Sequence, residues 1–158
     1  MNISENKEKS FYLSHGTLMC RNLIESRKFY EEFLGLEVVR ASAVTIYLRL
    51  NSSFYIVCVE AGENIPNQHM LTHWGLNLIS NKEVDQFRAQ ALSSKESYGL
   101  KRILPMHKMH GVYGFYFQDR DNNWWEIQHD PHPVDQIFKN GDVNLAVKEV
   151  SPENVQSQ

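Results

Sequence analysis

The chain has little cysteine, no strong excess of one charge and no long apolar segment. Its two cysteines, Cys20 and Cys58, are not spaced as a disulfide framework, which predicts reduced, buried thiols in a cytoplasmic protein. A net charge of −3 offers no general attraction to nucleic acid or to an anionic membrane. The apolar runs are only strand-length, and residues 1–10 lack the apolar core of a signal peptide. We therefore expect neither nucleic acid nor a membrane as a partner.

The length and apolar content predict one compact domain. A chain of 158 residues that is 42% hydrophobic can bury one sizeable core, and it is too short for two ordinary domains. Residues 1–10 and 136–158 are polar, and they are expected to be loosely held extensions. The domain itself is expected to cover residues 11–135.

An internal repeat organises this domain. A strand pattern, a helix pattern and three further strand patterns occur at about 11–62 and again at about 70–130. Three residues of the first unit recur in the second with the same displacement of 58 positions: His15, Leu18 and Phe29 match His73, Leu76 and Phe87. Two such βαβββ units predict an α+β fold, in which two curved mixed sheets form a cupped, pseudo-twofold barrel with the helices outside.

Three residues in this repeat suggest a metal site. His15 and His73 lie on the first strand of their units, and a pseudo-twofold axis would bring these strands together at the centre of the cup. Glu126 lies in an apolar last strand, where a carboxylate is costly to bury unless it is paired or coordinated. Each residue alone is equally consistent with a structural role. Together they match a common ligand set for Fe(II), Mn(II) or Zn(II), which leaves positions open for substrate and water.

The repeat also indicates a missing fourth ligand. Tyr47 precedes Val57 by ten residues, just as Tyr116 precedes Glu126. Val57 therefore stands where a second carboxylate would complete a symmetric site. Glu60 is a weak substitute, because it should face the other side of a regular strand.

These segments resemble the vicinal oxygen chelate superfamily, which includes glyoxalase I, type I extradiol dioxygenases, fosfomycin-resistance transferases and bleomycin-resistance proteins. The resemblance covers about 11–130 and rests on SHGTLMCRNLIESRKFYEEFLGLEVV, THWGLNL and FYFQDRDNNWWEI. In that superfamily the residues that match His15, His73 and Glu126 are the metal ligands. Members are often homodimers, and some exchange modules between chains so that one site draws on two subunits.

The site pattern is most similar to single-domain extradiol dioxygenases, which bind Fe(II) on two histidines and one glutamate. Their signature matches the spacing of His107, Tyr116 and Glu126. The resemblance implies that Tyr116 hydrogen-bonds a substrate oxygen, that His107 lines the pocket, and that a small catechol-type aromatic substrate and O2 bind the iron. The chain departs from the signature at Arg120 and Asn122, where the family has Pro and then Gly or Pro.

Three residues are candidates for the group that transfers protons. The family's acid–base histidine falls near Phe54 or Tyr55 of this chain. Tyr55, also a candidate for substrate binding, His107 and His110 are therefore the candidates. If residues 110–117 form a regular strand, His110 looks into the cup, where an imidazole carries a proton near neutral pH. A rim position without a role fits His110 equally well.

Two other functions share the ligand pattern. Fosfomycin-type transferases use positions that match Thr17 and Tyr116, but Met106 stands where they have a lysine. A glyoxalase-type isomerase would have a ligand at Val57. The alternatives are thus a Mn- or Zn-dependent transferase or lyase of glyoxalase or fosfomycin-resistance type, and a non-catalytic resistance protein that binds an aromatic compound.

Overall fold

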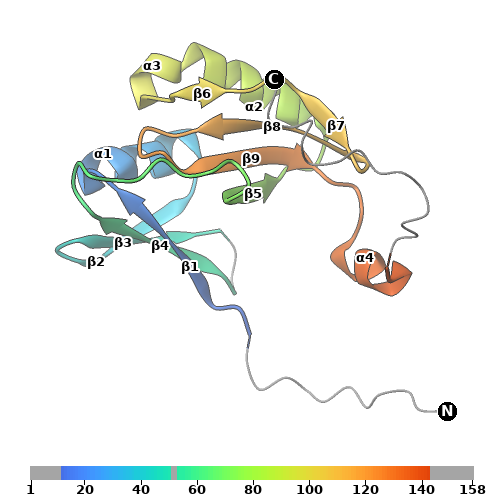
Figure 1. Ribbon diagram of the computed structural model, residues 1–158, viewed down its shortest axis with the longest axis horizontal. Helices are drawn as coiled ribbons and strands as arrows, with labels where there is room; N and C mark the ends of the chain where they lie inside the picture. Colours follow the sequence, from blue (N-terminus) through green and yellow to red (C-terminus); the bar gives the residue numbers. More distant parts are fainter. Residues whose placement is uncertain (1–11, 51–52, 143–158) are drawn as a thin grey trace.

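The computed structural model describes residues 12–50 and 53–142, so the predicted extension at 1–10 and residues 143–158 of the predicted tail lie outside the described residues. The first unit, here called the N-module, contains β1 (His15–Cys20), α1 (Leu23–Lys28), the π-helical turn η1 (Phe29–Phe33), β2 (Glu37–Ser42), β3 (Thr45–Arg49) and β4 (Tyr55–Glu60) (Figure 1). The second, the C-module, contains β5 (His73–Asn77), α2 (Asn81–Ser93), α3 (Lys95–Tyr98), β6 (Arg102–Ile103), β7 (His107–Met109), β8 (Val112–Gln118) and β9 (Trp124–His129). Helix α4 (Val134–Asn140) follows.

The two modules have the same topology. Their strand orders are β1-β4-β3-β2 and β5-β9-β8-β6, with β7 also paired to β8. In each sheet the first and last strands pair in parallel, and the other neighbours pair antiparallel. This confirms the predicted α+β fold of two βαβββ units. Within the described residues the strands form two separate sheets rather than one closed barrel.

Apolar residues at helical spacing predict one helix over 23–34 that stops at Gly35, and the structure forms it from two elements. The side chain of Asn22 caps the start of α1 by accepting hydrogen bonds from two backbone N–H groups of its first turn. The helix then widens into η1, where the N–H of Leu34 donates to the carbonyl of Phe29 across five residues at 3.2 Å. Gly35 follows with a left-handed φ of +68°, which ends the helix as the sequence predicts.

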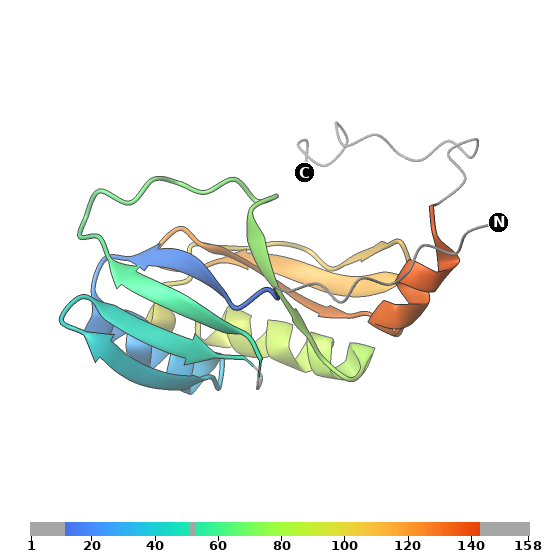
Figure 2. The ribbon, with the colours of Figure 1, turned by 90° about the horizontal axis from the view of Figure 1, so that it is seen from below.

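The aromatic residues of this helical segment pack against the C-module. Phe29, Tyr30 and Phe33 are buried. The rings of Phe29 and Tyr30 lie 6.4 and 6.0 Å from the ring of Trp125, and Phe33 lies 5.8 Å from Phe117. The two modules therefore share one hydrophobic core. Figure 2 shows α1 and α2 together on one side of the sheets.

Side chains along each strand point alternately to the helix-covered face of the sheet and to the opposite face, which is here called the open face. In the N-module one row across this face contains Val39, Tyr47, Val57 and Thr17. Val39 and Tyr47 are 51% and 39% exposed, so apolar surface of this sheet faces solvent in a single chain. In the C-module, Tyr116 and Glu126 lie opposite each other on the open face. The predicted site is thus on the side away from the helices.

The second half differs in detail from the prediction. Strand β8 starts at Val112 rather than at 110, because His110 and Gly111 form a turn with φ of 52° and 84°. His107 lies in the three-residue strand β7. Cys20 and Cys58 are free and buried, as expected. Among the described residues, every helix is too short or too polar to cross a bilayer.

Candidate metal centre

The carboxylate of Glu126 is the centre of a small polar cluster on the C-module. Strand β9 presents this side chain on the open face, where it is 8% exposed. Nε2 of His73 lies 3.1 Å from Oε2 of Glu126, and Nε2 of His107 lies 3.2 Å from Oε1. The fold therefore brings two of the predicted metal ligands, His73 and Glu126, into contact, together with the predicted pocket residue His107.

The ring of His73 is held in an orientation suited to metal binding. Its Nδ1 lies 2.8 Å from the carbonyl oxygen of Met70. A carbonyl oxygen only accepts, so Nδ1 carries a hydrogen, and Nε2 is the ring atom that faces Glu126. Metal-binding histidines are usually fixed in this way through their second nitrogen. This contact is not predictable from the sequence, because Met70 contributes only a backbone atom.

His107 and Tyr116 form the other side of the cluster. Their rings are stacked, with centroids 5.0 Å apart and an interplanar angle of 20°. His107 is mostly buried, yet within the described part of the chain neither of its ring nitrogens has a partner in hydrogen-bond geometry. Because buried polar atoms are normally hydrogen-bonded, the cluster has capacity left for a bound group.

The protonation states of the cluster follow from burial and contacts. Burial raises the pKa of Glu126, but its contacts with His107 and Tyr116 and the nearby His73 lower it by more, so the net pKa is below the usual value. Burial and then the contact with Glu126 raise the pKa of Tyr116 well above its usual value. At neutral pH the site therefore holds an ionised carboxylate beside a phenol that keeps its proton.

His15 does not join this cluster within one chain. It is exposed, its Nδ1 lies 2.9 Å from Oγ of Ser14, and its ring stacks on Tyr55 at 5.4 Å. In residues 12–50 and 53–142, no three histidine, cysteine, aspartate or glutamate side chains are grouped so that they could hold a metal ion. The nitrogen and carboxylate donors of His73 and Glu126 suit Fe(II), Mn(II) or Zn(II), but they are two ligands of a set of three.

Two other residues considered from the sequence lie away from the cluster. His110 is exposed in the β7–β8 turn, so the expectation that it lies within a strand facing the cup is wrong. Oε2 of Glu60 accepts a 2.7 Å hydrogen bond from the backbone N–H of Leu23, at the start of α1. That contact accounts for the carboxylate of Glu60 and leaves the fourth-ligand position to Val57.

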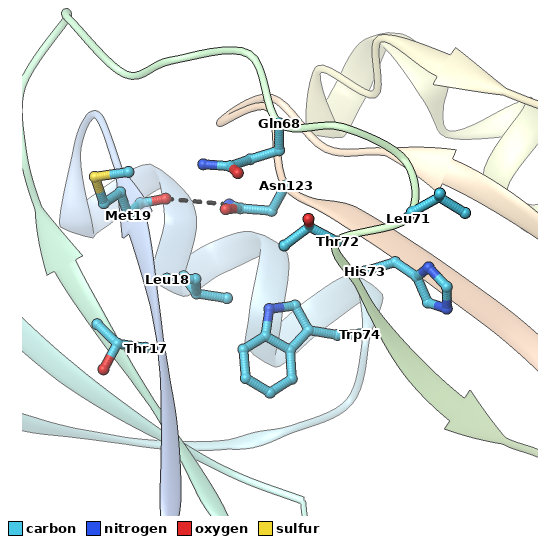
Figure 3. A pocket seen from close by; sticks show the side chains of 9 residues that line it. All are labelled: Thr17, Leu18, Met19, Gln68, Leu71, Thr72, His73, Trp74 and Asn123. Atoms are coloured by element: carbon cyan, nitrogen blue, oxygen red, sulfur yellow. Dashed lines mark hydrogen bonds between the residues drawn. The ribbon is translucent and has the colours of Figure 1, made fainter.

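A cavity of about 650 Å³ lies between β1 and the segment that leads into β5 (Figure 3). Thr17 lies on one wall and His73 on the other, with Trp74 beside it. A cavity of this size is typical of a small-molecule site. The predicted substrate-binding residue Thr17 and the predicted ligand His73 both line this cavity, but their side chains point away from each other, with Trp74 between them (Figure 3).

Residues 12–127 match the family described as the Glyoxalase/Bleomycin resistance protein/Dioxygenase superfamily. No curated protein matches the sequence. Similar solved structures include the fosfomycin resistance protein FosX from Listeria monocytogenes, which is 19% identical with a TM-score of 0.62 over 81% of this chain and 98% of that chain. The oxidase ChaP-H2 is 20% identical with a TM-score of 0.60, over 78% and 97%. A lactoylglutathione lyase from Agrobacterium tumefaciens is 19% identical with a TM-score of 0.56, over 78% and 96%.

At these identities the similar structures indicate the shared fold and no particular activity. The family match is different in kind, because it spans most of the chain and includes both modules. It also includes His73, His107, Tyr116 and Glu126, which form the cluster. The protein belongs to the glyoxalase/bleomycin resistance protein/dioxygenase superfamily.

Proposed function

We propose that this protein is an Fe(II)-dependent extradiol dioxygenase that cleaves the ring of a catechol-like substrate with O2. The observation that carries the proposal is the cluster of His107, Tyr116 and Glu126. These residues have the spacing that resembles the extradiol signature, and their side chains are in mutual contact. The three residues come from the neighbouring strands β7, β8 and β9, so the spacing along the chain is realised as contact between their side chains.

We further propose that the site is completed by a second copy of the chain. The partner's His15 would join His73 and Glu126, since His15 of the same chain is not grouped with them. The open face of the N-module supports this, because its exposed Val39 and Tyr47 form apolar surface that a second sheet would cover. Twofold packing would place the N-module of each chain over the C-module of the other and create two equal sites.

Each residue has a distinct role in this proposal. His73, Glu126 and the partner's His15 would hold the metal, which when bound supplies a Lewis acid for the two catechol oxygens and a position for O2. Tyr116 keeps its proton and donates a hydrogen bond to a substrate oxygen. His107, whose Nε2 lies beside Glu126 and whose Nδ1 has no hydrogen-bond partner in the described part of the chain, accepts a proton from a substrate hydroxyl.

The direct test uses anaerobically purified protein loaded with Fe(II). We expect O2 uptake and a yellow ring-cleavage product with at least one catechol, and neither from the His73→Ala variant. A wild-type protein that binds Mn or Zn and consumes no O2 with any catechol would contradict the dioxygenase proposal.

The shared site has its own test. His15→Ala and Glu126→Gln chains carry their defects in different modules, so each homodimer has two defective sites. When the two chains are co-expressed, half of the dimers are mixed, and each mixed dimer regains one intact site. We expect about a quarter of the wild-type activity. Folded mixed dimers without activity would contradict a site built from two chains.

A metal-dependent transferase or lyase is the second candidate. Thr17 favours it, because it lines the same cavity as His73 and matches a position used by fosfomycin-type enzymes. Thiol addition to an epoxide substrate with Mn(II), in the absence of O2 uptake, would support the transferase function.

A protein that binds an aromatic compound equally well with and without metal, and turns over nothing, would instead be a resistance protein that sequesters its ligand.

A further inference from the structure

Arg102 lies on the same open face as the metal cluster. On β6 it is opposite Gln118 of β8, which is opposite Trp124 of β9, which is opposite His73 of β5. Directly opposite residues share one face of a sheet. One row of side chains therefore runs from the edge of the C-module to the predicted ligand His73, with Arg102 exposed at its outer end.

Among the residues that the structure describes, no carboxylate pairs with the guanidinium of Arg102. Its Cζ lies 5.3 Å from the centroid of the Trp124 ring, a cation–π contact that leaves its N–H donors available. The other arginines of the described ranges are engaged: Arg21, Arg27, Arg49 and Arg120 pair with carboxylates, and Arg40 and Arg88 donate to backbone carbonyls. Among them, Arg102 alone has neither kind of partner.

The position of this cation defines what it would bind. Trp124 and Glu126 are two residues apart on one face of β9, which places them about 7 Å apart along the strand. An aromatic ring held at Glu126 would therefore need a short side chain, directed along β9 toward Trp124, to approach the guanidinium that lies over that indole. A planar guanidinium binds a carboxylate through two parallel hydrogen bonds.

We propose that Arg102 is a specificity-determining residue, which binds the carboxylate of an aromatic acid whose ring occupies the site at Glu126. This inference rests on the proposed function for the identity of the ring. The proposed function alone does not distinguish a neutral catechol from a charged one. The inference about Arg102 specifies that the substrate is an anion.

Binding is tested first, without turnover. Calorimetry on the intact protein would compare phenylacetate with its neutral analogue phenylacetamide. Arg102→Gln should weaken phenylacetate binding about tenfold to a hundredfold, the usual range for a lost charge-assisted pair, and should leave phenylacetamide binding unchanged. The control is Lys108→Gln, which removes an exposed positive charge from β7 of the same module. Lys108 is opposite Tyr113, which contacts Asp85 of α2, so it lies on the helix side of the sheet.

Turnover gives the second measurement. With dihydroxyphenylacetate, Arg102→Gln should raise KM by the same factor with little change in kcat, and with methylcatechol both constants should stay at wild-type values. Equal wild-type affinity for phenylacetate and phenylacetamide, or equal effects of Arg102→Gln and Lys108→Gln, would overturn the inference. A protein that binds phenylacetate through Arg102 but cleaves no catechol would instead overturn only the dioxygenase proposal.

Discussion

The hydroxyl of Ser26 donates a 2.6 Å hydrogen bond to Oδ2 of Asp121, 95 residues further along the chain. Oδ1 of the same carboxylate accepts a 3.0 Å hydrogen bond from the backbone N–H of Arg21. Ser26 lies on α1 of the N-module, and Asp121 lies in the turn between β8 and β9 of the C-module. Both side chains are buried, so one carboxylate ties the two modules together on the helix side.

Asp121→Ala should lower the free energy of unfolding by about 2–4 kcal/mol, because Ser26 and Arg21 lose the acceptor of buried hydrogen bonds. Urea unfolding measures this change. The control is Glu31→Ala, which breaks an exposed pair with Arg27 on the same helical segment and should cost less than about 0.5 kcal/mol. Equal losses in the two variants would show that Asp121 does not hold the modules together.

The contact between Gly16 of β1 and Trp74 of β5 gives a second prediction. A Cβ at position 16 would overlap the indole, with Cζ3 at 2.8 Å and Cζ2 at 2.9 Å. Gly16→Ala must therefore displace the Trp74 indole or move the two strands apart, which should cost about 1–3 kcal/mol in thermal unfolding. Gly75→Ala on β5 is the matched control, because nothing lies within 4 Å of its new Cβ. Adding Trp74→Leu to Gly16→Ala should recover part of the loss, and a further loss instead would refute the steric account.

Asp119 should make stability depend on pH. Burial raises its pKa from 3.8 to about 6, against the lowering effect of hydrogen bonds from Trp125 and Asn123. Since the folded pKa exceeds the unfolded value, the contribution to stability is full below about pH 4 and is lost as the pH rises through about 6. The lost contribution is on the order of 3 kcal/mol.

The measurement is the difference in unfolding free energy between wild type and Asp119→Asn. Other titrating groups largely cancel in this difference, and the amide does not titrate. We expect the unfolding free energy of wild type to rise relative to that of the variant as the pH falls from 7 to 4.5. A difference that is constant over this range would mean that Asp119 is ionised throughout.

The two histidines of the β7–β8 hairpin should behave differently in catalysis. His107→Ala should lower kcat about a hundredfold or more, because it removes the proposed proton acceptor beside Glu126. His110→Ala should change kcat less than about threefold, because His110 is exposed in the turn. Bound metal is measured in both variants, so that loss of the metal is distinguished from loss of proton transfer. A larger effect at His110 would reverse the assignment.

Much of the fold could be predicted because it repeats. The alternation of apolar residues located the long strands, and the displacement that relates His15 to His73 located the two modules. Strand β7 was not predictable, since three residues carry too little periodicity and this strand depends on pairing with β8. The turn at His110 was missed for a related reason, because a positive φ is uncommon for a residue other than glycine.

The site was predictable where it depends on one module and unpredictable where it depends on how modules meet. The spacing of His107, Tyr116 and Glu126 reflects neighbouring strands of one sheet, so sequence distance translates into contact. The position of His15 depends on which open face lies opposite the N-module. No local pattern encodes that choice, since the same residues would serve a site within one chain or between two.

The π-helical turn η1 has a consequence for the lengths that this part of the chain tolerates. Its wide turn holds one residue more than an α-helix would, and this lets Phe29, Tyr30 and Phe33 all face the core. Deleting Glu31 or Glu32 would remove a solvent-facing side chain, a change that looks harmless in an alignment. It would also restore regular helical winding and rotate Phe33 away from the core. Relatives that keep these aromatics should therefore share the length of this segment, and gaps should collect outside it.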